Sequence, residues 1–156
     1  MKVKAISLWE PWASLIKTGA KKFETRSWAT SYRGPLVICA AKGGLPKREL
    51  LFELSCWSMQ GGLAPLVGEP LDLTGKSWPG VKLEDLSFGK ALCVVDLVDC
   101  IKTDDLALGQ IGTDKPFGNF GLGRYAWKLE NVRVLEPPFE VKGKQGFFEV
   151  EIQESV

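Results

Sequence analysis

The stretch Ser7–Lys42, SLWEPWASLIKTGAKKFETRSWATSYRGPLVICAAK, decides how the N-terminal part of the chain folds. Pro11 is suited to a helix start, and the apolar spacing that follows predicts a short helix over 12–18. Gly19 is well placed to end that helix. Beyond it, Lys22–Trp28 alternates between two faces and predicts a strand with three charged side chains on one face.

The rest of the chain is dominated by predicted strands. Alternating or continuous apolar runs predict strands at 3–8, 22–28, 36–41, 91–101, 124–135 and 145–152, and helices at 12–18 and 47–59. The Pro137–Pro138 pair is expected to end the strand at 124–135. The pattern predicts an α+β fold, mainly β: a small β-barrel with peripheral helices. We expect one domain over 1–156, with a loop-rich, Gly- and Pro-rich insertion at about 61–88.

Composition excludes several classes of protein. With 156 residues, 45% hydrophobic and 25% charged, the chain has the make-up of a globular domain with a substantial core. Its apolar runs are too short for a membrane span, and its first residues lack the apolar segment of a signal peptide. We therefore expect a cytoplasmic or nuclear protein with no membrane partner.

The sequence favours neither a bound metal ion nor catalysis by a histidine base. The chain has no histidine, so no mechanism that uses an imidazole base is available. Its four cysteines, Cys39, Cys56, Cys93 and Cys100, form no C-x-x-C pair, so reduced and mostly buried thiols are expected. We expect neither a metal nor a cofactor.

Positive charge is concentrated near the N-terminus although the net charge is only +1. Residues 1–48 hold ten Lys or Arg against two acids, whereas 49–156 hold ten against seventeen. This asymmetry predicts a basic face that meets an anion. The alternative is that folding returns the later acids to the neighbourhood of these bases.

At this point the residues resemble a known family, the ASCH domain, named for homology to activating signal cointegrator proteins. Its G-x-K-x-x-E-x-R signature is matched by Gly19, Lys21, Glu24 and Arg26. The cointegrator-like branch is further matched by Trp28, Arg33–Gly34, the strands around 95–100 and 124–127, and Lys142–Gly143. The resemblance implies a PUA-like β-barrel with a cleft, a fold used to bind RNA or modified bases.

The same resemblance raises an enzymatic alternative, a metal-independent hydrolase of an acylated nucleoside or of RNA. In one branch of the family the lysine matching Lys21 is the catalytic candidate, acting with a threonine where this chain has Glu24. A lysine acts as base only when neutral, and its ordinary pKa is about 10.4. A neighbouring carboxylate stabilises the charged form. Unless burial overcomes this, Lys21 and Glu24 favour recognition over catalysis.

The leading hypothesis is a module that binds RNA, single-stranded nucleic acid or a modified nucleoside in a basic cleft. Glu24 can accept from a base amine and Arg26 can donate to phosphate or guanine, although the two could simply pair with each other. Trp28 is the best candidate for stacking on a base. The full predicted set is Lys21, Glu24, Arg26, Trp28, Arg33, Lys42, Arg124, Trp127 and Lys142.

A third hypothesis is a protein-interaction module of a larger complex related to transcription or RNA. The Pro- and Gly-rich stretch 61–88, which contains Trp78, would then be the docking segment. We expect the chain to be a monomer under any of the three hypotheses.

Overall fold

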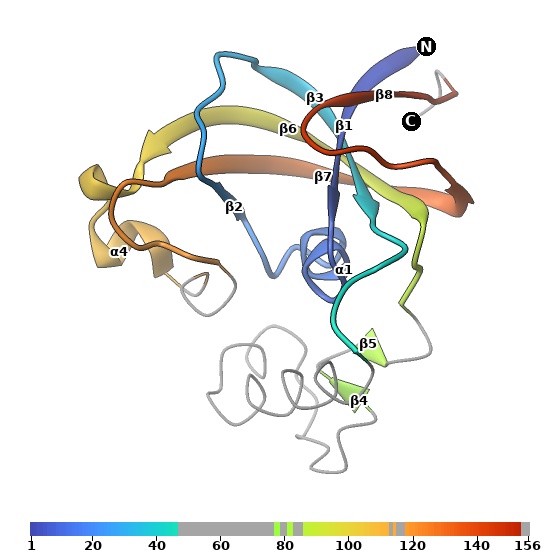
Figure 1. Ribbon diagram of the computed structural model, residues 1–156, viewed down its shortest axis with the longest axis horizontal. Coiled ribbons are helices and arrows are strands. Elements are labelled where there is room, and N and C mark those ends of the chain that lie inside the picture. The colour runs from blue at the N-terminus through green and yellow to red at the C-terminus, as the bar shows by residue number, and fades with distance from the viewer. Residues whose placement is uncertain (47–76, 79–80, 83–85, 113, 115–117, 154–156) are drawn as a thin grey trace.

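A curled sheet of six strands forms the body of the protein (Figure 1). The computed structural model describes residues 1–46, 77–78, 81–82, 86–112, 114 and 118–153. Within them the sheet consists of β1 (Lys2–Leu8), β2 (Phe23–Arg26), β3 (Gly34–Ala40), β6 (Lys90–Lys102), β7 (Tyr125–Glu140) and β8 (Phe148–Glu151). The strand order is β2-β7-β6-β3-β1-β8, with β1 and β3 parallel and every other neighbouring pair antiparallel. The sheet curves into a half-barrel, which confirms the predicted mainly-β class.

Short helical segments lie at the margins of this sheet. The helix α1 (Trp12–Lys17) packs against β1, β3, β6 and β7. The 3-10 helix η2 (Thr103–Asp105) and the helix α4 (Leu108–Ile111) lie between β6 and β7. None of the described helices has the length and apolar content needed to cross a membrane. Gly19 has φ +85° directly after α1, which confirms it as the helix stop.

The insertion predicted at 61–88 falls largely outside the described residues. There the structure describes only a small pair of strands, β4 (Ser77–Trp78) and β5 (Val81–Lys82), and the residues from 86 onward. The helix predicted over 47–59 lies wholly outside the described residues.

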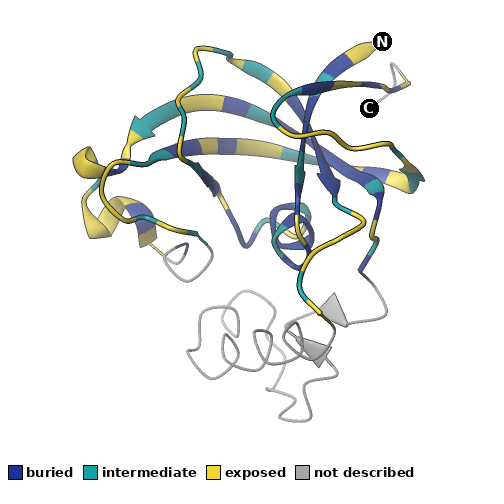
Figure 2. Cartoon of the chain, in the orientation of Figure 1, coloured by how far each residue is buried: buried dark blue, intermediate teal, exposed yellow. Residues whose placement is uncertain are grey.

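Two apolar clusters cover the two faces of the sheet. Ile6 and Leu8 of β1 belong to one cluster, while Val3 and Ala5 of the same strand belong to the other. The strand β3 alternates between the clusters in the same way, so all residues from Leu36 to Ala40 are buried. This double burial explains the continuous apolar run in the sequence. Figure 2 shows the buried residues gathered in β1, β3 and α1.

The strand β7 does not end at Pro137–Pro138, contrary to the sequence prediction. It continues to Glu140 because the prolines fall where the β6–β7 register is already irregular. Cys93 pairs with Val134 and Ala91 with Phe139, so several β7 residues lie opposite a single β6 residue. Proline lacks an N–H and is tolerated where no ladder bond is needed.

The start of α1 is anchored by Glu10, a carboxylate that is only 1% exposed. It accepts hydrogen bonds from the backbone N–H of Ser14 at 2.8 Å, the Ser14 hydroxyl at 2.6 Å and the backbone N–H of Ser87 at 3.1 Å. Burial raises the pKa of Glu10, and the hydrogen bonds from Ser14 and Ser87 oppose that rise. Glu10 therefore ties the helix to the chain that enters β6.

Replacing this anchor, Glu10→Ala, is expected to lower the free energy of unfolding by roughly 2–3 kcal/mol. The substitution leaves buried donors of Ser14 and Ser87 without an acceptor, and each such donor costs about 1–3 kcal/mol. Urea denaturation followed by circular dichroism measures the change. Glu149→Ala, at an exposed position of β8, is the control and should stay within about 0.5 kcal/mol of the wild type. Equal stability of the two variants would contradict the anchoring role of Glu10.

Candidate functional site

The signature residues lie on β2, an edge strand, and immediately before it. Glu24 pairs across the ladder with Trp127 of β7. Lys21 is 2% exposed and Glu24 is 8% exposed, so both are buried. The Nζ of Lys21 lies 3.5 Å from Oε1 of Glu24, and Oε2 of Glu24 accepts from Nε of Arg26 at 3.1 Å. Glu24 therefore bridges two cations, and we call these three residues the signature triad.

A second buried carboxylate, Asp114, forms hydrogen bonds with the backbone at the start of β2. It is 1% exposed and accepts from the backbone N–H groups of Lys22, at 2.9 Å, and Phe23, at 2.8 Å. Burial raises the pKa of Asp114, while those backbone N–H groups and the charge of Lys21 oppose the rise. Sequence reasoning missed Asp114 because its partners lie more than ninety positions earlier and no local pattern marks it.

Burial lowers the pKa of Lys21 despite the attraction of Glu24 and Asp114. The sequence argument left this outcome open, and burial is the larger effect. However, the Lys21 side chain is 1% exposed and its ammonium contacts Glu24. A substrate could reach it only after a rearrangement of the triad. The hydrolase hypothesis therefore stays a prediction.

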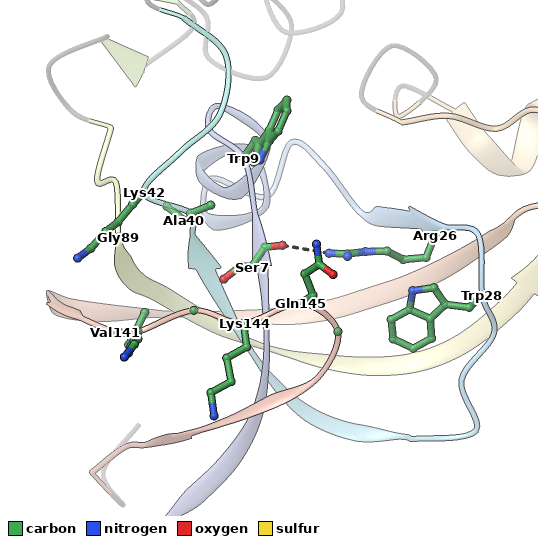
Figure 3. Close-up of a pocket in the computed structure, with 14 residues that line it drawn as sticks. Ser7, Trp9, Arg26, Trp28, Ala40, Lys42, Gly89, Val141, Lys144 and Gln145 are labelled. Atoms are coloured by element: carbon green, nitrogen blue, oxygen red, sulfur yellow. Dashed lines mark hydrogen bonds between the residues drawn. The ribbon is translucent and has the colours of Figure 1, made fainter.

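The third member of the triad, Arg26, extends from the edge strand toward β1. Its Nη2 lies 3.0 Å from Oε2 of Glu24 and donates to the backbone carbonyl of Ser7 at 3.1 Å, the contact dashed in Figure 3. Its Nη1 makes no hydrogen bond with any described residue. The guanidinium is thus fixed in orientation while one edge stays available to a ligand.

Arg26 forms part of the wall of a concave site, which we call the basic cleft. Its volume is about 740 Å³, within the range of roughly 300–1,000 Å³ typical of ligand pockets. The lining residues are Ser7, Trp9, Arg26, Trp28, Ala40, Ala41, Lys42, Gly89, Val141, Lys142, Gly143, Lys144, Gln145 and Gly146. Figure 3 shows Arg26, Gln145 and Trp28 at one end and Lys42 with Gly89 at the other. Among the described residues that line the cleft, none is acidic.

Two tryptophans contribute aromatic surface to the cleft. Trp9 is 52% exposed, and Trp28 is half-buried. The Trp28 ring packs edge-to-face on Trp127 at 4.7 Å and on Phe147 at 5.5 Å between centroids. Trp127, predicted as a ligand contact, is fully buried and belongs to the core, where it supports Trp28 from behind. Stacking on a ligand needs an exposed ring face, which Trp127 lacks.

Arg33 and Arg124, also predicted as ligand contacts, do not line the cleft. Nη1 of Arg33 donates to the carbonyls of Thr30 at 2.9 Å and Tyr32 at 2.8 Å, which closes its own turn. Arg124 donates to the carbonyls of Asn119 and Thr25 and braces the loop before β7. Both guanidinium groups therefore have structural partners.

Of the predicted residues, the cleft brings together Arg26, Trp28, Lys42 and Lys142, while Lys21 and Glu24 lie buried behind Arg26. Its basic side chains come from both ends of the chain rather than from residues 1–48 alone. The predicted set did not include Ser7, Trp9, Lys144 or Gln145. The position of Lys144, two residues after Lys142 in a Gly-flanked segment, is a signal that could have identified it.

The sequence that forms this sheet and carries the signature triad matches a known class of domain. The ASCH domain family profile matches residues 6–139, so the chain belongs to the ASCH domain family. Among curated proteins, activating signal cointegrator 1 of Mus musculus is 35% identical over 96 residues, and the Homo sapiens protein of the same name is 34% identical over 96 residues. Each match covers 62% of this chain but only 14% of the relative, so the matched region is a small part of those proteins.

Proposed function

We propose that the basic cleft binds single-stranded RNA or DNA, with the lysines on phosphates and a base stacked on a tryptophan. The observation that carries the proposal is the make-up of the cleft: three lysines, Arg26, Trp9 and Trp28, and no acid among the described lining residues. Phosphate contacts from Lys and Arg supply most of the affinity for a nucleic acid. Aromatic side chains add stacking without sequence preference.

Within the cleft, charge supports a division of roles. Lys42, Lys142 and Lys144 are exposed and form no ion pair with a described residue, so each offers a full charge to a phosphate. Arg26 and Lys21 both pair with the carboxylate of Glu24, which partly neutralises the charge of Arg26. The same ion pair holds the guanidinium in one orientation. A fixed guanidinium with a free edge suits hydrogen bonding to a base.

The relatives do not identify the ligand, because their name, activating signal cointegrator 1, states none. The proposal itself rests on the cleft.

Fluorescence anisotropy with a labelled short oligonucleotide, at 50 and 200 mM salt, tests the proposal. If three lysines each neutralise one phosphate, log K falls against log salt with a slope of about −2 for a single strand, or roughly 20-fold over this interval. Weak binding that is insensitive to salt, or no binding of either RNA or DNA, would contradict it. Stronger binding of duplex than of single strands would argue against a stacked base.

Trp9→Ala is expected to weaken binding of the same oligonucleotide by about 5- to 100-fold. The ring is 52% exposed and lines the cleft, and loss of one base–aromatic stack costs roughly 1–3 kcal/mol. Because the ring is exposed, the melting temperature should change little. Leu122→Ala, at a site that is 84% exposed and away from the cleft, is the control. Unchanged affinity in the folded Trp9 variant would remove Trp9 from the interface.

A further inference from the structure

The segment Lys142–Gly146, which we call the phosphate loop, joins β7 to β8 and contributes all five of its residues to the cleft. Just before it, the N–H of Val141 donates to the carbonyl of Gly89 at 3.0 Å. From Lys142 to Gly146, no backbone N–H donates a hydrogen bond to any described residue. The segment that lines the cleft therefore carries backbone N–H groups that no described residue accepts from.

The loop passes close to β1 at Gly143. A Cβ atom at Gly143 would lie 2.5 Å from Oγ of Ser7, closer than real side chains approach. The Oγ of Ser7 is buried and makes no hydrogen bond with a described residue. It lies next to the backbone of Gly143. The carbonyl of the same serine holds Arg26. Ser7 thus lies next to both the loop and the guanidinium of Arg26.

Basic side chains gather around this segment of the cleft. Lys142 and Lys144 flank Gly143, and Lys42 lines the same cleft. Elsewhere the described arginines that could extend a basic track have partners: Arg33 and Arg124 bond to carbonyls, and Arg133 forms a 2.9 Å pair with Asp96. Clustered cations without a counter-charge repel one another, and a bound anion relieves that repulsion. A run of free backbone N–H groups beside them favours an anion at the same place.

We propose that the phosphate loop binds the terminal phosphate of a nucleic acid strand, so that the cleft holds the end of a strand rather than its middle. This inference rests on the proposed function. A terminal monoester carries a charge of about −1.5 to −2 with three free oxygens, whereas an internal diester carries −1 with two. The two lysines of the loop, Lys142 and Lys144, and backbone N–H groups without a described partner match the greater charge and the larger number of acceptors.

One oligonucleotide sequence prepared in three forms, with a 5′-phosphate, with a 3′-phosphate and with hydroxyls at both ends, tests this inference. We expect one phosphorylated end to bind at least tenfold more tightly than the hydroxyl form, measured by competition anisotropy with the full chain. Equal binding of the three forms would overturn the terminal-phosphate site and leave the proposed function standing. Failure of all three to bind would overturn both.

A mutant cycle between Ser7 and Gly143 tests the position of the loop. Gly143→Ala should displace the loop and lower the preference for the phosphorylated end about tenfold. Ser7 itself lines the cleft, so the Ser7→Ala variant alone measures what its side chain contributes to that preference. The double variant should restore it, because the remaining contact, 3.6 Å to Cβ of Ser7, is acceptable. A double variant no better than Gly143→Ala, with all proteins folded by thermal melting, would contradict the loop position.

Discussion

Reversing the charge of Lys142 and Lys144 together, by Lys142→Glu with Lys144→Glu, is expected to lower the affinity for single-stranded nucleic acid by about 100-fold or more. Each lysine is exposed and lines the basic cleft. A hydrogen bond to a charged group contributes about 1.5–3 kcal/mol, and each 1.4 kcal/mol is tenfold in affinity. Loss of two such bonds gives the stated factor, and the added repulsion between glutamate and phosphate increases it. Anisotropy at a fixed salt concentration measures the change.

The matched control is Lys22→Glu with Lys102→Glu. These two lysines are also exposed, and neither lines the cleft. The control changes the net charge by the same amount, so it measures the long-range electrostatic effect alone, which we expect to stay below about fivefold at 150 mM salt. If the two double variants lose affinity equally, the phosphates do not bind in the cleft.

Glu24→Gln is expected to lower the free energy of unfolding by about 3–5 kcal/mol. Glu24 is the only carboxylate among the described ion pairs that joins Lys21 to Arg26. Its neutral replacement leaves a buried ammonium beside a guanidinium, and removing one partner of a buried ion pair costs about this much. Asp114 still attracts Lys21 but is held by the backbone of Lys22 and Phe23. For a domain of this size the melting temperature should fall by roughly 10 °C.

An exposed ion pair on β7 supplies the control for this variant. Lys128 and Glu130 lie 3.7 Å apart with side chains 46% and 55% exposed. Pairs of this kind contribute about 0–1 kcal/mol, so Glu130→Gln should change stability by less than 1 kcal/mol. Chemical denaturation of both variants in the same buffer gives the comparison. A Glu24→Gln protein as stable as Glu130→Gln would show that the triad does not hold β2 in place.

Local sequence patterns predicted the strands of this protein well, because alternation and apolar runs report burial directly. The runs at 3–8 and 91–101 correspond to β1 and β6, and Gly19 ends the helix as expected. The order of the strands could not be predicted in the same way. The edge strand β2 pairs with β7, about one hundred residues later, and no local pattern encodes that partner.

The predicted set and the observed cleft differ at Trp127 and Arg33, and in both cases the reason is local. Trp127 lies in the core because Lys128 and Glu130 take the exposed positions of the alternation on β7, a pattern that was available in the sequence. Arg33 was predicted to contact phosphate; its Nη1 donates to two carbonyls of its own turn, and the residue does not line the cleft. Backbone carbonyls in a turn can accept hydrogen bonds from an arginine side chain, and the sequence alone does not show which of them do so.

The positions of the cleft lysines near the C-terminus depend on pairing between strands that are distant in the sequence. Lys142 and Lys144 reach the cleft because β8 pairs with β1, with Phe148 opposite Ala5, and so places the preceding loop beside Ser7. The charge asymmetry of the sequence indicated a basic face in residues 1–48, and of these two lysines Lys142 was predicted as a ligand contact whereas Lys144 was not. Half of the basic side chains in the observed cleft come from the C-terminal end.

The measurement that tests the basic cleft most directly is an NMR titration of ¹⁵N-labelled protein with a short single-stranded RNA at low salt. We expect the largest shifts at the backbone amides of 142–146, at Lys42, and at the indole N–H groups of Trp9 and Trp28. Saturable shifts confined to these positions would place the ligand in the cleft. Shifts centred instead on the α4 end of the sheet, around Leu108 and Leu122, or no shifts at saturating RNA, would contradict it.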